Sequence, residues 1–132
     1  MNYLVDTHIL LWSFFEPVRL SVNTQTILLN TSNAIYYSPV SLWEISIKYG
    51  LKKIQLNGSS PEEFFQELIS SFYLCKEIEG IKMITNYNLP FHHKDPFDRY
   101  IIWEAIQSNL VLISADGMID RYKNSNLKIV CN

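Results

Sequence analysis

Four acidic residues occupy positions where an α/β protein would place a catalytic site. Asp6 and Asp116 each follow a short apolar segment with the character of a buried strand. Glu44 and Asp98 lie near the start of segments with helical periodicity. Carboxylates that converge repel one another, and a hard divalent cation bound between them relieves that repulsion. The pattern therefore predicts a Mg²⁺ or Mn²⁺ site.

The chemistry expected of such a site is phosphodiester hydrolysis. Zinc is disfavoured because the sequence has no Cys and His set at zinc-ligand spacing. Mg²⁺ usually keeps several water molecules and few protein ligands, which leaves coordination positions for a substrate phosphate. One or two such ions orient a water molecule, lower its pKa and stabilise charge on the attacking and leaving oxygens.

Each acid also has a purely structural explanation. Asp6 is suited to cap a helix that begins after it, and Glu44 is suited to pair with Lys48 four residues later. Asp95, which precedes a proline, has the pattern of a helix N-cap, with Asp98 as an acid in the first turn of the helix. Asp116, which precedes a glycine, has the pattern of a turn residue. These explanations account for the acids one by one but not for their shared placement.

The segments that carry the acids alternate between strand and helix. Strands are predicted at residues 2–6, 34–37, 74–78, 110–114 and 127–130, and helices at 7–15, 20–29, 39–50, from 61 onward, 80–87, 96–108 and 117–122. This alternation predicts a three-layer α/β fold, with a mostly parallel central sheet of four to five short strands and helices on both faces. Ligands of such sheets bind beyond the carboxyl ends of the strands, where the four acids fall.

The composition is that of an ordinary globular protein. The 132 residues are 48% hydrophobic and 18% charged with a net charge of -2, which excludes disorder and argues against binding nucleic acid by bulk charge alone. Four glycines are too few and too scattered for a GxGxxG or GxxxxGK[ST] phosphate loop. We expect one domain spanning 1–132, without a membrane span or signal peptide, in the cytoplasm. Cys75 and Cys131 are expected as reduced thiols packed in apolar surroundings.

Four motifs in this order resemble those of a known family. They are Leu4-Val5-Asp6-Thr7-His8, Val40-Ser41-Leu42-Trp43-Glu44-Ile45, Asp95-Pro96-Phe97-Asp98-Arg99 and Leu112-Ile113-Ser114-Ala115-Asp116. The ordered set is similar to that of PIN-domain ribonucleases of the VapC toxin type, over essentially the whole chain. The resemblance implies a PIN-like fold and a Mg²⁺- or Mn²⁺-dependent endoribonuclease that is the toxin of a toxin-antitoxin pair.

The resemblance also implies roles for individual residues and partners. The catalytic residues would be Asp6, Glu44, Asp98 and Asp116; the metal ligands Asp6, Asp98 and Asp116; and the supporting residues Thr7, Ser114 and Arg99. Glu44 would bind the metal or position water. The implied partners are an RNA substrate, with transfer RNA among the candidates, an inhibiting antitoxin and a second copy of the chain. A PIN-fold binding module without catalysis and a PIN nuclease of RNA processing remain alternatives.

The remaining polar and aromatic residues predict less. The histidines, His8, His92 and His93, fit no Ser-His-Asp or HExxH arrangement and are expected in loops or supporting roles. The tryptophans, Trp12, Trp43 and Trp103, are expected in the core or a dimer interface rather than in a base-stacking platform. Lys52 and Lys53 are expected at a solvated helix end, and Asp120 on a solvated face.

Overall fold

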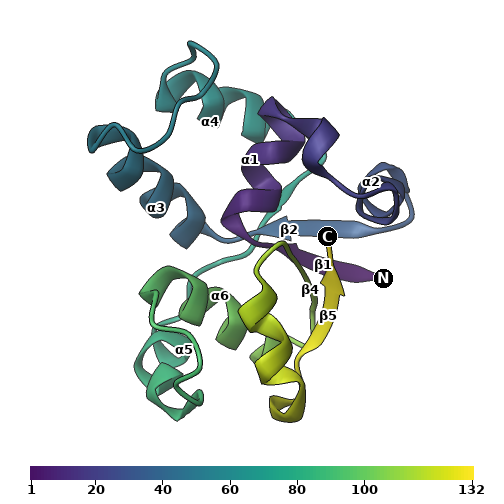
Figure 1. The fold of residues 1–132 in the computed structure, drawn as a ribbon, viewed down its shortest axis with the longest axis vertical. Coiled ribbons are helices and arrows are strands. Elements are labelled where there is room, and N and C mark those ends of the chain that lie inside the picture. The colour runs from purple at the N-terminus through teal and green to yellow at the C-terminus, as the bar shows by residue number, and fades with distance from the viewer.

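A sheet of five parallel strands forms the middle layer of the computed structural model, which describes residues 1–132 (Figure 1). The strands are β1 (Asn2–Val5), β2 (Ala34–Tyr37), β3 (Leu74–Cys75), β4 (Val111–Ser114) and β5 (Lys128–Cys131). Their order is β3-β2-β1-β4-β5, and all four pairings are parallel. The predicted α/β fold with a central sheet of four to five strands is confirmed.

Helices cover both faces of this sheet. They are α1 (Thr7–Phe15), α2 (Val22–Leu29), α3 (Pro39–Gly50), α4 (Pro61–Ile69), α5 (Gly80–Ile84) and α6 (Pro96–Gln107), with 3₁₀ helices η1 (Pro17–Arg19), η2 (Thr85–Asn88) and η3 (Gly117–Ser125). In Figure 1, α1 to α4 lie on one side of the sheet, and α5 and α6 lie on the other. The predicted strand at 74–78 shortens to two residues, and the predicted helix at 117–122 is a longer 3₁₀ helix.

Local polar residues fix where the helices nearest the acids begin. Asp6 caps α1 by accepting the backbone N–H of Ile9 at 2.8 Å. Asp95 caps α6 by accepting the N–H groups of Phe97 and Asp98 at 2.8 and 3.3 Å. Proline occupies the first position of α3, α4 and α6, where its missing N–H costs nothing.

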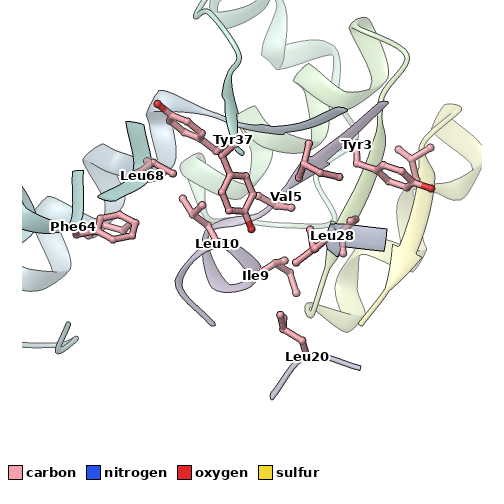
Figure 2. Close-up of a cluster of buried hydrophobic side chains, with 14 of the residues drawn as sticks. Tyr3, Val5, Ile9, Leu10, Leu20, Leu28, Tyr37, Phe64 and Leu68 are labelled. Carbon is pink, nitrogen blue, oxygen red and sulfur yellow. The ribbon is translucent and has the colours of Figure 1, made fainter. Parts of the chain in front are cut away.

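Alternate side chains of the central strands enter two separate cores. Tyr3 and Val5 of β1 face a cluster of 15 buried residues shared with α1, α2 and α4 (Figure 2). Leu4 faces a second cluster of ten buried residues shared with α6 and η3. Leu4 pairs in register with Leu112 of β4, and both are fully buried. Burial of one such side chain stabilises the fold by roughly 1.5–3 kcal/mol, which fixes the register of the strands that end at the acids.

Three packing expectations need correction or refinement. Cys75 and Cys131 are free thiols as predicted, but both are exposed because they end the two edge strands, so the expected apolar packing is wrong. Trp43 is not a core residue: it is 63% exposed and packs edge-to-face on Phe97, with ring centroids 5.3 Å apart. Trp12 and Trp103 are partly buried against the two cores. None of the helices has the length and apolar character that a membrane crossing requires.

Candidate active site

The four predicted acids gather at the carboxyl ends of β1 and β4. Asp6 directly follows β1, and Asp116 lies two residues after β4. Glu44 lies in the second turn of α3, and Asp98 lies in the first turn of α6. α3 packs against both α1 and α6, which brings the four positions together.

Asp98 carries the clearest electrostatic signature of this convergence. Burial, together with the negative charges of Asp95, Glu44 and Asp6, raises the pKa of the Asp98 carboxyl to about 7. The nearby His93 acts in the opposite direction but does not outweigh them. Negative charge at this site is therefore only partly compensated by the protein itself.

Asp6 is held by donors from two elements. Its Oδ1 accepts the N–H of Ile9, and its Oδ2 accepts the hydroxyl of Ser114 at 2.5 Å and the N–H of Ala115 at 3.3 Å. Burial raises the pKa of Asp6 although these hydrogen bonds oppose it. The Ser114 hydroxyl also accepts the N–H of Asp116 at 3.0 Å. Ser114 thus links two of the predicted metal ligands.

Glu44 is buried and has both carboxylate oxygens engaged. Oε1 accepts the hydroxyl of Thr7 at 2.7 Å, and Oε2 pairs with the ammonium of Lys48 at 2.5 Å. Burial acts to lower the pKa of Lys48, but the hydrogen bond and charge of Glu44 raise it overall. Thr7 therefore supports Glu44 directly, and the Glu44–Lys48 pair expected from the spacing is present.

His93 occupies a central position that the sequence did not indicate. Its Nε2 lies 2.6 Å from Oδ2 of Asp116 and 3.3 Å from Oδ2 of Asp98. Its Nδ1 accepts the backbone N–H of Asp95 at 3.1 Å, which assigns the ring proton to Nε2. His93, Asp98 and Asp116 form the one group whose potential ligand atoms all lie within 4.8 Å of one another. The oxygens of Asp6 and Glu44 lie outside that group.

Asp116 differs from Asp98 in its titration. Burial acts to raise the pKa of Asp116, but the N–H of Met118 and the imidazole of His93 lower it below its ordinary value overall. Two neighbouring carboxyls are thus shifted in opposite directions. Opposed shifts of this kind are typical of functional sites, although structural networks also produce them.

Arg99 supports the site through a loop, not through the acids. Its buried guanidinium donates to the carbonyls of Leu89 at 3.0 Å, Pro90 at 3.0 Å and His93 at 3.3 Å. It also lies 3.8 Å from the ring centroid of Phe91. No ion pair joins Arg99 to the acids, because these carbonyls accept the N–H groups of the guanidinium. Arg99 instead fixes the loop, residues 89–95, that carries His93.

Tyr122 of η3 holds the same loop from the other side. Its hydroxyl accepts the N–H groups of His92 at 3.1 Å and His93 at 2.8 Å, and donates to the carbonyl of Pro90 at 2.9 Å. The sequence did not single out Tyr122, whereas the loop or supporting role expected of the histidines fits His93. The one available signal was the position of His93 just before Asp95, which caps the helix that carries Asp98.

Asp120 is not part of the site. It is exposed, and its carboxylate pairs with Lys123 of the same helix at 3.1 Å. The predicted solvated position is confirmed. The residue is therefore a suitable control for substitutions of the clustered acids.

Comparisons with known proteins agree with this geometry. The structure of VapBC2 from Rickettsia felis bound to a DNA fragment from their promoter is 19% identical, with a TM-score of 0.68 over 99% of this chain and 98% of that chain. The structure of FitAB bound to an IR36 DNA fragment is 17% identical, with a TM-score of 0.63 over 99% of this chain and 94% of that chain. The structure of FitAcB from Neisseria gonorrhoeae is 18% identical, with a TM-score of 0.57 over 100% of this chain and 97% of that chain. No curated protein matches the sequence.

These structures share the fold of the chain at identities too low to carry function. The comparison with family models is more specific, because the model of the family described as PIN domain matches residues 3–124. That range includes all four acids and the loop that carries His93. The chain belongs to the PIN domain family.

Proposed function

We propose that the chain is a Mg²⁺- or Mn²⁺-dependent endoribonuclease and the toxin of a toxin-antitoxin pair. The observation that carries the proposal is the cluster of carboxylates at the carboxyl ends of β1 and β4, where burial and then neighbouring negative charge raise the pKa of Asp98 to about 7. A hard cation among these carboxylates would remove the repulsion that the fold leaves in place. The family match supports a nuclease in particular.

The donor set fits an oxygen-seeking cation. Asp6, Asp98 and Asp116 would hold it. The hydrogen bond from the N–H of Asp95 to Nδ1 of His93 assigns the ring proton to Nε2, which then donates rather than ligates. Carboxylate ligands without a free imidazole nitrogen favour Mg²⁺ or Mn²⁺ over zinc. When bound, such an ion supplies charge stabilisation to phosphate oxygens and lowers the pKa of a coordinated water.

The chain's own residues would position the reactants. Glu44, whose oxygens contact Thr7 and Lys48, is rigidly placed and is suited to orient water. The Nε2–H of His93 is a fixed hydrogen-bond donor beside Asp98 and Asp116. Ser114 fixes Asp6 relative to Asp116.

The RNA substrate and the protein partners rest on resemblance. The ordered motifs resemble those of VapC-type toxins, and the fold is shared with VapBC2 and FitAB. We therefore propose a structured RNA, such as transfer RNA, as substrate, and a homodimer as the assembly. The antitoxin would insert an Arg or Lys among the carboxylates, where the basic side chain takes the place of the cation.

A cleavage assay tests this function. Partner-free protein is incubated with total RNA in Mn²⁺ or Mg²⁺, beside Asp98→Asn, Asp120→Asn and an EDTA control. We expect discrete fragments from the wild type and from Asp120→Asn, and none from Asp98→Asn or in EDTA. Fragments of the same size and yield from folded Asp98→Asn would overturn the proposed function.

A further inference from the structure

A cleft of about 300 Å³ runs along α1, the helix that Asp6 caps. One wall is a single face of α1, formed at spacings of three and four residues by His8, Leu11, Trp12 and Phe15. The other wall comes from η1 and from the loop, residues 51–60, that joins α3 to α4. This volume is at the lower end of the range for pockets that hold small ligands, roughly 300–1,000 Å³.

The cleft reaches the first turn of α1, which directly follows Asp6. His8, which lines its end, lies two residues after Asp6 and in the first turn of α1. A nucleic-acid strand with one phosphate at the acids could therefore pass directly over His8. We propose that this cleft binds the nucleotide next to the scissile phosphate, an inference that rests on the proposed nuclease function.

Planar side chains line the cleft in a row. The ring of His8 lies 5.7 Å from that of Trp12, and the guanidinium of Arg19 lies 4.3 Å from the ring centroid of Trp12. His8 and Arg19 are both exposed. Exposed imidazole and guanidinium planes are surfaces on which nucleobases stack. Trp12 is partly buried and packs against both the His8 ring and the Arg19 guanidinium.

Two polar side chains of the cleft, those of Lys53 and Gln55, are free to meet a ligand. Lys53 and Gln55 are exposed and take part in no ion pair or side-chain hydrogen bond within the chain. The single acid of the lining, Glu16, is already paired with Arg19 at 3.1 Å. The cleft thus has surplus positive charge in a chain whose net charge is -2. That charge attracts a phosphate and repels the basic segment expected of an antitoxin.

The loop that carries these groups is already fixed in place. Leu56 is 1% exposed and belongs to the larger core cluster. The amide of Asn57 donates to the carbonyl of Phe15 at 3.3 Å. Asn57 and Gly58 adopt positive φ values of 51° and 82°, which Asn and Gly tolerate best. Gln55 and Lys53 are therefore presented by an anchored segment, so little ordering is required on binding.

A larger hollow of about 600 Å³ is formed by the same loop and shares Ile54 and Gln55 with the cleft. Its lining residues all fall within 49–59 and include none from α1. It therefore has no wall beside the acids. Lys52 lines this hollow, whereas Lys53 lines the cleft, which provides two adjacent exposed lysines on different surfaces.

A binding experiment tests the cleft without requiring catalysis. AMP, GMP, CMP and UMP are titrated separately into ¹⁵N-labelled Asp98→Asn protein, and the three indole N–H signals are assigned with Trp12→Phe. We expect the Trp12 signal to shift with at least one nucleotide while those of Trp43 and Trp103 do not. Lys53→Gln in the same background should raise the nucleotide Kd by about fivefold to tenfold, and Lys52→Gln should leave it unchanged. No shift at Trp12, or equal effects of the two lysine substitutions, would overturn the proposal.

The cleavage assay separates failure of the cleft from failure of the nuclease. Gln55→Ala and Lys53→Gln should still cleave RNA in Mn²⁺, but Gln55→Ala should alter the base preference beside the cut and Lys53→Gln should raise KM by about tenfold. Cleavage at the same positions with unchanged KM would reject the cleft and leave the nuclease intact. An inactive wild type would reject the nuclease, and the nucleotide titration would then decide the cleft alone. A shift of the Trp12 signal with an acidic peptide, and none with any nucleotide, would reject the nucleotide proposal and assign the cleft to a protein partner instead.

Discussion

His93 donates its Nε2–H to the carboxylate of Asp116 across 2.6 Å, although 23 residues separate them in the chain. The backbone N–H of Asp95 fixes the proton on Nε2 by donating to Nδ1. The metal-free acids are therefore held by an imidazole N–H as well as by backbone donors. This contact makes His93 a positioning residue for the predicted metal ligands.

Replacement of His93 should weaken the metal site without unfolding the chain. His93→Ala removes the donor that orients Asp116, so we expect Mn²⁺ affinity to fall by roughly 10–100-fold, as for other residues that orient metal ligands. His93→Gln retains an N–H donor and should recover part of the affinity. His92→Ala is the matched control, because the exposed His92 side chain only packs on Tyr122. Calorimetric titration with Mn²⁺ measures all four proteins, and equal affinities for wild type and His93→Ala would exclude the role.

Asp98 should make the metal-free protein less stable as the pH rises. The pKa of Asp98 is about 7 in the fold against an ordinary value of 3.8, so the folded state binds more protons than the unfolded state between these values. Its contribution to the free energy of unfolding therefore falls as the pH rises from about 4 to about 7. Because the side chain is 21% exposed, solvent screening leaves an effect on the order of 1–2 kcal/mol.

Asp98→Asn should remove most of that pH dependence. In EDTA at pH 8 we expect the variant to melt about 5 °C above wild type, with the difference shrinking toward pH 4. Asp120→Asn, on the exposed surface, should track the wild type at every pH. Circular-dichroism melts across this range provide the measurement. A lower melting temperature for Asp98→Asn at pH 8 would mean that the carboxylate stabilises α6 more than repulsion destabilises the site.

Ser114 should couple stability to activity through its hydroxyl. Ser114→Ala removes the donor to Asp6 and the acceptor for the N–H of Asp116, which should lower the free energy of unfolding by about 1–3 kcal/mol and reduce cleavage. Ser114→Thr keeps a hydroxyl and should retain more of both. Urea unfolding and initial cleavage rates of the two variants provide the comparison. Identical behaviour of the Ala and Thr variants would show that the hydroxyl is dispensable.

Tyr122 should affect catalysis through the loop that carries His93. Tyr122→Phe removes a hydroxyl that accepts two N–H groups and donates to one carbonyl, so we expect a loss of about 1–3 kcal/mol in unfolding and a weaker Mn²⁺ site. Tyr3→Phe is the matched control, because the Tyr3 hydroxyl contacts only the Met1 sulfur at 3.6 Å. Unfolding and Mn²⁺ titration together test the effect. A Tyr122→Phe protein that loses stability but binds Mn²⁺ as wild type does would limit Tyr122 to a structural role.

Local signals explain why much of the fold was predictable. The bounds of α1 and α3 agree with the predicted 7–15 and 39–50, because Asp6, Ser38 and Pro39 mark where these helices begin. β2 was likewise predicted at 34–37. β3 is shorter than predicted because it pairs with β2 through two residues only. Strand length at a sheet edge depends on the partner strand and is not encoded locally.

The loop that carries His93 was not predictable for the same reason. Its conformation depends on Arg99 and Tyr122, and Tyr122 contacts it from 29 and 30 residues away. The acids could be proposed from their positions after strands and in first helical turns, which are readable from sequence. The imidazole between them could not, because its direction is set by tertiary contacts.

Mn²⁺ binding by partner-free protein tests the central claim most directly. Calorimetry at pH 7.5 would compare the wild type with Asp98→Asn, Asp116→Asn and the control Asp120→Asn, with circular dichroism to verify folding. We predict saturable binding of at least one ion to the wild type and to Asp120→Asn, and its loss in the other two variants. Binding of equal affinity and stoichiometry to all four folded proteins, or to none of them, would contradict a metal site built from these acids.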